Sequence, residues 1–150
     1  MYHDLLRIVA DDMRRFGFQP QPPCSEAQIG RLSERVSREL RMELPDGYKD
    51  FLRCTNGFDW NGVVVFAGET VPVAAQPDRS ISGLVEMNHI YREDERFGPL
   101  LVFGSDGMHI YAYNGVNRVY EIYDEVPHEL VETLPSFADM IMKALARSLQ

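Results

Sequence analysis

The order in which helical and extended segments follow one another constrains this chain more than any other feature. Five short segments rich in β-branched or aromatic residues lie at 63–66, 71–74, 100–103, 108–113 and 118–123. Three segments with helical spacing precede them and one follows them, whereas 81–91 fits either a helix or a loop. Strands that cluster together and do not alternate with helices are typical of an α+β fold. We therefore predict an α+β domain with a mostly antiparallel sheet packed against N-terminal and C-terminal helices.

The first two predicted helices have clear sequence signals. The first covers 2–16 and ends at Gly17, and its apolar stripe consists of Leu5, Leu6, Ile8, Val9 and Met13. The second follows Ser25, a good N-cap, and Gln28 completes a capping box. Its apolar residues recur at helical spacing, at Ile29, Leu32, Val36 and Leu40. Its other face carries mixed charges, which predict a solvated surface formed by Arg31, Glu34, Arg35, Arg38 and Glu39.

Cap signals also bound the third and the last predicted helix. Pro45 suits the first turn of the third helix, where its missing N–H costs nothing, and Asn56-Gly57 ends that helix. Ser136 caps the last helix, and Asp139 in its first turn is favoured by the helix dipole. The residues predicted to face the core are Tyr48, Phe51 and Leu52 in the third helix and Phe137, Met140, Ile141, Ala144, Leu145 and Leu149 in the last.

The two alternating segments 108–113 and 118–123 flank Asn114-Gly115, a strong signal for a β-hairpin. With a loop of two or four residues, one face carries Met108, Ile110, Ala112, Val119, Glu121 and Tyr123, and the other carries His109, Tyr111, Tyr113, Tyr120 and Ile122. A loop of three residues would change this pairing. Neither face is clearly polar. Either helices cover both faces, or one aromatic face is exposed and available to a partner or to a second copy of the chain.

Length and composition indicate one globular domain, since the 150 residues include 45% hydrophobic and 25% charged residues. The N-terminus lacks a basic region followed by an apolar run, and no stretch approaches the ~20 apolar residues of a membrane span. We therefore expect a cytoplasmic protein without membrane contact. Cys24 and Cys54 belong to no metal or redox motif, so we expect reduced thiols.

The net charge of −8 is distributed unevenly along the chain. Residues 1–53 contain nine basic and nine acidic residues, whereas 54–150 contain six basic and fourteen acidic residues. Because nucleic-acid-binding proteins carry the opposite sign, we expect no nucleic-acid partner. An acidic surface suits a basic protein partner, but it also serves solubility alone, and charge by itself favours the second interpretation.

The sequence contains no recognisable motif of catalysis or cofactor binding. No GxSxG, HExxH, GxxxxGK[ST] or GxGxxG pattern occurs, and none of the four histidines lies four residues from another. The Ser105-Asp106-Gly107 turn lacks the acidic ladder of a calcium loop. We therefore predict no catalytic residue, no metal site and no cofactor, and we expect a binding protein.

Acidic side chains supply most of the candidate binding residues. Five carboxylates fall within twelve residues, at Glu121, Asp124, Glu125, Glu129 and Glu132, and no lysine or arginine occurs between Arg118 and Lys143. This cluster is either a surface for a basic partner or a plain solvated loop.

Two further segments are candidates. Glu93, Asp94 and Glu95 form a second acidic run. Asp59 and Trp60 follow the Asn-Gly turn, which predicts an exposed loop where Trp60 is either a contact residue or a cap of the core. The predicted partner-binding residues are Asp59, Trp60, Glu93, Asp94, Glu95, Glu121, Asp124, Glu125 and Glu129.

The segment 44–58, LPDGYKDFLRCTNGF, resembles the signature of the SUKH superfamily. The shared pattern is a leucine-proline start, an aromatic residue, Phe-Leu and Asn-Gly, here Leu44, Pro45, Tyr48, Phe51, Leu52, Asn56 and Gly57. The resemblance continues through ISGLVEMN, LLVFGSDG, a tyrosine-rich strand and the SFADMI helix, and it covers roughly 25–149. Residues 1–20 then form a helix and a proline-rich loop that extend the single domain. The pattern is most similar to the bacterial YrhA-like branch.

The SUKH superfamily includes yeast cell-wall-synthesis regulators and many bacterial immunity proteins. The resemblance therefore implies a SUKH-like α+β domain that binds and neutralises a cognate bacterial toxin. Many such toxins are nucleases with basic clefts, which an acidic surface would fit. The alternative is a regulatory or scaffold module without a toxin partner. The signature assigns no contact residues, and we expect a monomer or a homodimer.

Overall fold

The computed structural model describes residues 2–150. The helical elements are α1 (Tyr2–Arg15), α2 (Glu26–Arg35), the π-helical turn η1 (Val36–Leu40), α3 (Asp46–Cys54), α4 (Leu84–Tyr91), the 3-10 turn η2 (Glu95–Phe97) and α5 (Phe137–Ser148). The strands are β1 (Phe58–Trp60), β2 (Val63–Val65), β3 (Val71–Val73), β4 (Gln76–Ile81), β5 (Leu100–Ser105), β6 (His109–Asn114), β7 (Val119–Asp124) and β8 (Leu130–Leu134).

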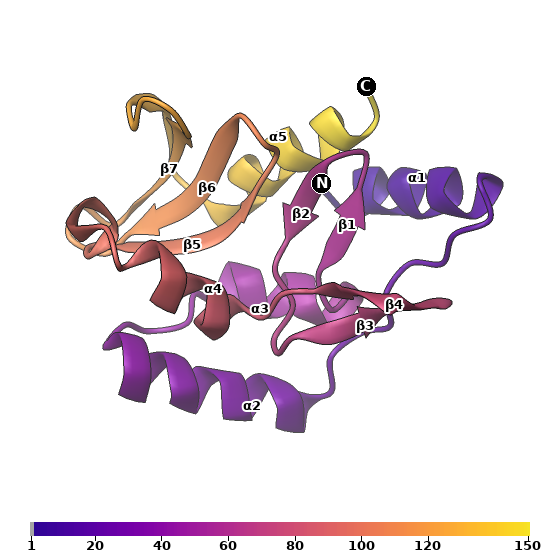
Figure 1. The fold of residues 1–150 in the computed structure, drawn as a ribbon, viewed down its shortest axis with the longest axis horizontal. Coiled ribbons are helices and arrows are strands. Elements are labelled where there is room, and N and C mark those ends of the chain that lie inside the picture. The colour runs from indigo at the N-terminus through magenta and orange to yellow at the C-terminus, as the bar shows by residue number, and fades with distance from the viewer. Residues whose placement is uncertain (1) are drawn as a thin grey trace.

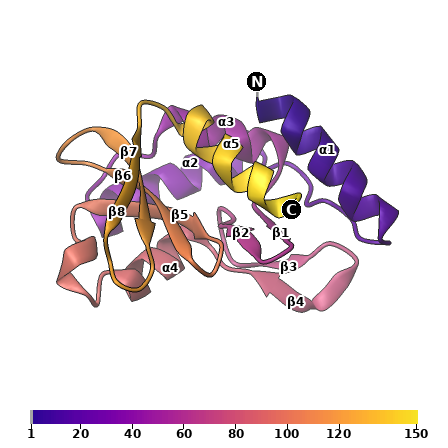
Figure 2. The ribbon, with the colours of Figure 1, turned by 90° about the horizontal axis from the view of Figure 1, so that it is seen from above.

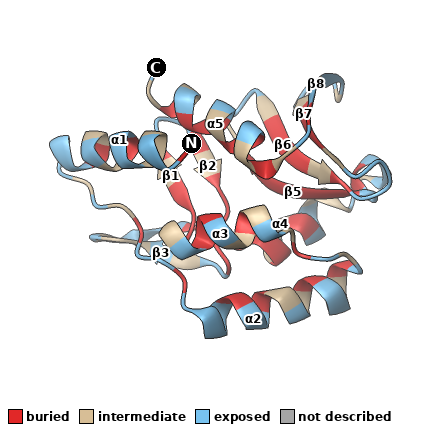
Figure 3. Cartoon of the chain, turned by 180° about the vertical axis from the view of Figure 1, so that it is seen from behind, coloured by how far each residue is buried: buried red, intermediate tan, exposed pale blue. Residues whose placement is uncertain are grey.

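Six strands form one sheet in the order β1-β2-β5-β6-β7-β8, and β3 and β4 form a separate pair. Every pair of neighbouring strands is antiparallel, so the predicted α+β class with a mostly antiparallel sheet is confirmed. Figures 1 and 2 show α3, α5 and α1 on one side of this sheet and α4 on the other. Buried residues lie on the strands and on the inner faces of the helices, while α1 and α2 present exposed outer faces (Figure 3).

An aromatic cluster at the centre joins the sheet to α3 and α5. The ring of Phe137 in α5 lies 5.2 Å from Phe103 in β5, 5.9 Å from Tyr48 and 6.0 Å from Phe51, measured between centroids. The Tyr48 hydroxyl, fully buried, donates to the carbonyl oxygen of Phe66 at 2.7 Å. The inward residues predicted for the third helix are therefore confirmed, and the motif at 44–58 serves the core.

The boundaries of α3 differ from the prediction. Pro45 is the N-cap and has an extended ψ of 141°, so the helix begins one residue later. The helix ends at Cys54, followed by an extended Thr55 as C-cap, and only Gly57 of the Asn-Gly pair has a positive φ, of 76°. Asn56 does not cap the helix, since Thr55 is the C-cap. The Oδ1 of Asn56 instead accepts a hydrogen bond from the Gly68 N–H at 2.8 Å.

The other predicted helices agree in position with the structure. Ser25 and Gln28 form the complete capping box, and Ser136 caps α5 by accepting from the Asp139 N–H. One residue of the predicted α1 stripe is wrong: Ile8 is 52% exposed, because α1 packs chiefly through Tyr2, Val9 and Met13. The segment 81–91, which fitted either a helix or a loop, contains the helix α4 at Leu84–Tyr91, whereas Ile81 ends β4. The short strands β1, β4 and β8 were not predicted.

The predicted hairpin is confirmed, with a four-residue loop at 115–118 between the paired Asn114 and Val119. Ile110 lies opposite Tyr123 and Tyr111 opposite Ile122, so the two faces have the predicted members. Ile110 is 1% exposed and Tyr111 is 2% exposed. Both faces are therefore covered, and the alternative of one exposed aromatic face is wrong.

Asn88 holds α4 against β5. Its Oδ1 accepts from the Val102 N–H at 2.8 Å, and its Nδ2 donates to the carbonyl oxygens of Val102 and Leu84, each at 2.8 Å. The residues of β5 that pair with β2 are Gly104 and Ser105. The Asn88 amide, which is fully buried, therefore makes the hydrogen bonds with Val102 that a neighbouring strand would otherwise make.

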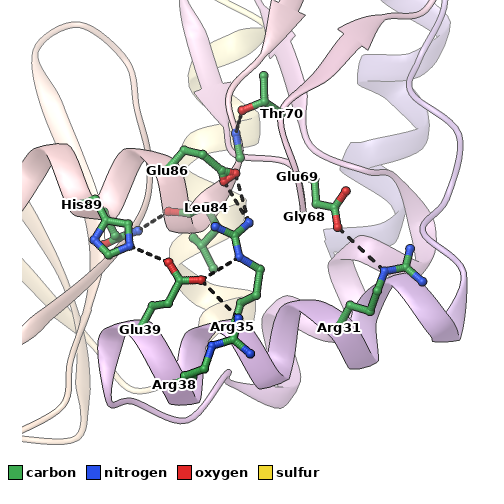
Figure 4. A network of polar contacts seen from close by, with 12 residues as sticks. Arg31, Arg35, Arg38, Glu39, Gly68, Glu69, Thr70, Leu84, Glu86 and His89 are labelled. Carbon is green, nitrogen blue, oxygen red and sulfur yellow. Dashed lines mark hydrogen bonds and ion pairs between the residues drawn. The ribbon is translucent and has the colours of Figure 1, made fainter.

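A network of charged residues holds the other side of α4 to α2 and η1 (Figure 4). Arg35 donates to Glu39 at 3.0 Å and to Glu86 of α4 at 3.2 Å, and His89 of α4 contacts Glu39 at 2.8 Å. The hydrogen bond from Arg35, and then that from His89, lowers the pKa of Glu39 to about 2. The prediction of a solvated face is wrong for Arg35 and Glu39, because α4 packs beside them.

We predict that Asn88→Ala lowers the free energy of unfolding by about 2–4 kcal/mol, because it leaves the buried N–H and C=O of Val102 without partners. Urea denaturation at pH 7 measures this loss. Asn117→Ala, at an exposed loop position, is the control and should change stability by less than about 0.5 kcal/mol. A loss below about 1 kcal/mol for Asn88→Ala would show that α4 does not depend on this amide.

Candidate partner-binding surface

Two acidic segments that are distant in sequence meet at one end of the sheet. Glu93 and Asp94 connect α4 to η2, which begins at Glu95. Asp124 ends β7, and Glu125 and Glu129 lie in the connection from β7 to β8. We call these six residues the acidic tip. The structure thus brings together six of the nine predicted partner-binding residues.

Aromatic rings beneath the acidic tip join its two halves. The His128 ring stacks on Tyr123, with centroids 4.5 Å apart and planes within 8°. The same ring meets Phe97 edge-on at 4.7 Å, and Phe97 lies 5.1 Å from Tyr91. Because Phe97 belongs to η2 and His128 to the β7–β8 connection, these rings fix the two acidic segments relative to each other.

The carboxylates of the acidic tip differ in their partners. Asp94 pairs with Arg96 at 2.6 Å, and this hydrogen bond lowers the pKa of Asp94 to about 2. Asp124 lies 3.6 Å from Nε2 of His109. Within residues 2–150, no cation pairs with Glu93, Glu95, Glu125 or Glu129, all of which are exposed. These four side chains are free to meet a cationic partner.

Burial and nearby charges shift the pKa values of two rings beneath the acidic tip. Burial, and then the charge of Glu125, raises the pKa of Tyr91. Burial, and then the charge of Arg96, lowers the pKa of His128 in spite of Asp94. The lowered pKa favours the neutral form of the His128 ring.

Exposed apolar side chains surround the acidic tip. Val126 is 90% exposed, Met108 is 71% exposed and Leu130 is 52% exposed. The Glu125 N–H donates to the carbonyl oxygen of Met108 at 2.8 Å, which places Met108 next to the tip. Together these residues form a surface with an apolar part and unpaired negative charge, as protein interfaces have. The sequence interpretation placed Met108 on a hairpin face and did not connect it with the acidic residues. It missed Leu130 because it did not recognise β8.

The structure places the other three predicted residues elsewhere. Trp60 is not in an exposed loop: it belongs to β1, is 9% exposed, packs against Phe18 at 5.2 Å and donates to Asp12 at 3.0 Å. Asp59 pairs with Arg79 at 2.9 Å. The expectation of an exposed loop at these residues is wrong, because α1 and its following segment cover Trp60.

Glu121 is also not at the surface. It is 4% exposed, and its carboxylate accepts hydrogen bonds from Asn114 at 2.9 Å and from the Tyr123 hydroxyl at 2.6 Å. Glu132, the remaining member of the predicted acidic cluster, pairs with Lys143 at 3.4 Å. The cluster seen in the sequence is therefore divided between the core, an ion pair and the acidic tip.

Other kinds of site have little support in the described residues. Residues 2–150 contain no group of three metal-ligating side chains and no helix that is long and apolar enough to cross a membrane. Cys24 and Cys54 are free thiols, and burial raises the pKa of Cys24 to about 11.

The sequence matches the model of the SMI1 / KNR4 family (SUKH-1) over residues 23–143. The chain belongs to this family. Proteins of the SUKH-1 family are commonly toxin-immunity or regulatory proteins and are generally not enzymes. The match includes the whole acidic tip, whereas α1 lies outside it. No curated protein matches the chain closely enough to count as a relative. The YrhA-like branch remains a prediction.

We predict that the pKa of His128 lies below the ~6.5 of a free histidine and rises in Arg96→Gln, which removes a nearby positive charge. A histidine with a lowered pKa binds fewer protons in the folded state, so its contribution to stability is present above pH ~6.5 and is lost as the pH falls through the folded pKa. NMR titration of the His128 ring measures both values. A pKa at or above ~6.5 in the unmodified protein would contradict the stacked, half-buried position.

Proposed function

We propose that this protein is an immunity protein that binds and neutralises a basic bacterial toxin, and that the acidic tip makes the contact. The observation that carries the proposal is the convergence of Glu93–Glu95 with Glu125 and Glu129 beside exposed apolar side chains. Membership of the SUKH-1 family supports a binding role of this kind. The protein would meet its partner in the cytoplasm of the cell that makes the immunity protein.

The proposed mechanism is occlusion of a positively charged cleft. Carboxylates held together without cation partners repel one another in the free protein, and lysine or arginine side chains of a partner relieve that repulsion. A toxin that acts on nucleic acid has a cleft that attracts phosphate groups, and the same cleft attracts the acidic tip. The apolar contact area of the proposed interface comes from Val126, Met108 and Leu130, which lie beside the charged residues.

Co-expression with the products of neighbouring genes tests the proposal. We expect one protein to co-purify at low salt, to be released as salt rises, and to be less toxic to cells that also make this chain. Absence of any partner at either salt, together with no protection, would contradict the proposal and favour the regulatory or scaffold alternative.

We predict that the double substitution Glu125→Lys/Glu129→Lys slows association with that partner by at least about tenfold at low salt, because surface charges govern the rate of encounter. Stopped-flow or surface-plasmon-resonance kinetics at two salt concentrations measure this. The matched control is Glu34→Lys/Asp78→Lys, which makes the same charge change at two exposed carboxylates without a cation partner in residues 2–150. Equal slowing by both double variants would show that net charge acts, not the acidic tip.

A further inference from the structure

The lysine and arginine residues of this acidic protein are almost all neutralised internally. Within residues 2–150, every one of them except three forms an ion pair with a carboxylate. The exceptions are Arg41, Arg92 and Arg118. In a chain with a net charge of −8, an arginine without a carboxylate partner is unexpected, and three of them call for an explanation.

All three unpaired arginines line one groove. The groove has a volume of about 890 Å³ and lies between the 40–46 segment, the 98–99 turn before β5 and the loop between β6 and β7. Small-molecule sites in proteins have volumes of roughly 300–1,000 Å³. We call this feature the arginine groove.

Arg92 is fixed in the wall of the arginine groove. Its Nη1 donates to the carbonyl oxygen of Leu40 at 2.9 Å and its Nη2 to that of Leu100 at 3.2 Å. Its Nε is buried and has no partner within residues 2–150. Burial lowers the pKa of Arg92. A half-buried cation without a counter-ion is unfavourable, and an anion bound in the groove would offset that cost.

Arg41 and Arg118, which line the groove, have unusual backbone conformations. Arg41 ends η1 with φ 54°, and Arg118 ends the β6–β7 loop with φ 57°. Glycine or asparagine adopts this left-handed conformation at lower cost than arginine does. Strained residues of this kind concentrate at functional sites. Glycine or asparagine would therefore stabilise the fold better than arginine does at these two positions.

The rest of the arginine groove is partly apolar. Met42, Tyr113 and Val116 line it, and the Tyr113 ring lies 5.0 Å from that of Tyr120. Two carboxylates also line it, Glu43 and Asp46, and Asp46 pairs with Lys49 at 3.6 Å. The groove thus combines three guanidinium groups with an aromatic and aliphatic wall.

We propose that the arginine groove binds a small molecule that carries a phosphate group. A phosphate monoester carries up to two negative charges and three acceptor oxygens, and guanidinium groups bind these oxygens in pairs. A single carboxylate offers one charge and suits three arginines less well. The organic part of the ligand lies against Met42, Tyr113 and Val116. This site is separate from the acidic tip, and the proposal does not rest on the toxin partner.

NMR titration of the whole chain at about 0.15 M ionic strength tests the proposal. The probes are inorganic phosphate, adenosine 5′-monophosphate, adenosine and succinate. We expect both phosphate-bearing probes to shift saturably the backbone signals of 40–46 and 113–120, and adenosine 5′-monophosphate to bind more tightly than phosphate. Absence of saturable shifts there, or equal affinity for succinate, would overturn the proposal.

Two glycine substitutions separate binding from folding. Arg41→Gly and Arg118→Gly each remove one guanidinium and allow the left-handed backbone, so we expect an unchanged or higher unfolding midpoint and a loss of phosphate affinity on the order of tenfold for each. Ala75→Gly, at another left-handed residue with φ 64°, and Arg14→Gln, at an exposed arginine of α1, are the controls and should retain affinity. An affinity that survives in the Arg41→Gly/Arg118→Gly double variant would contradict the assignment.

Discussion

The hydrogen bonds between the Asn88 side chain and the backbone of Val102 are the constraint on which both candidate sites depend. They attach α4 to β5 where no strand pairs with Val102 on that side. Arg92 follows α4 directly and enters the arginine groove, and Glu93–Glu95 follow Arg92 and form half of the acidic tip. The ion pairs of Arg35 with Glu39 and Glu86 hold the other side of the same helix (Figure 4). A buried amide and a charged network thus position a short helix whose C-terminal end supplies residues to two surfaces of opposite charge.

The net charge of −8 conceals an uneven distribution, because unpaired positive and unpaired negative side chains gather on different surfaces. Most cations are paired, and the unpaired ones meet in the arginine groove. The carboxylates of the acidic tip, in contrast, include four exposed glutamates without cation partners in the described chain. An ion pair at the surface adds little to stability, but an unpaired cluster creates a local field that selects a partner of the opposite sign. The two surfaces therefore differ in charge, which is the basis for proposing a basic protein at the tip and a phosphate-bearing small molecule at the groove.

Local signals in the sequence predicted the parts of the fold that depend on neighbouring residues. The capping box at Ser25 and Gln28 and the presence of the β6–β7 hairpin are examples, since each depends on residues a few positions apart. The sequence does not decide the loop length that sets the register of the hairpin. The errors arose where distant segments decide the environment. Trp60 is covered through Phe18 and Asp12, which lie far from it in the sequence. Glu121 is an error of another kind, because its buried carboxylate accepts hydrogen bonds from Asn114 and Tyr123 of the same hairpin. The arginine groove has no signal in the sequence, because an unpaired arginine is recognised only when the partners of all the others are known.

Hydrogen–deuterium exchange of the chain, alone and with its co-purified partner, tests most directly whether the acidic tip is the binding surface. Exchange slows at backbone amides that a partner buries or orders. We predict slower exchange in the complex at 91–97 and 123–131, with little change at 40–46 and 113–120. Protection confined to the arginine groove, or to the outer faces of α1 and α2, would contradict it and place the partner on another surface.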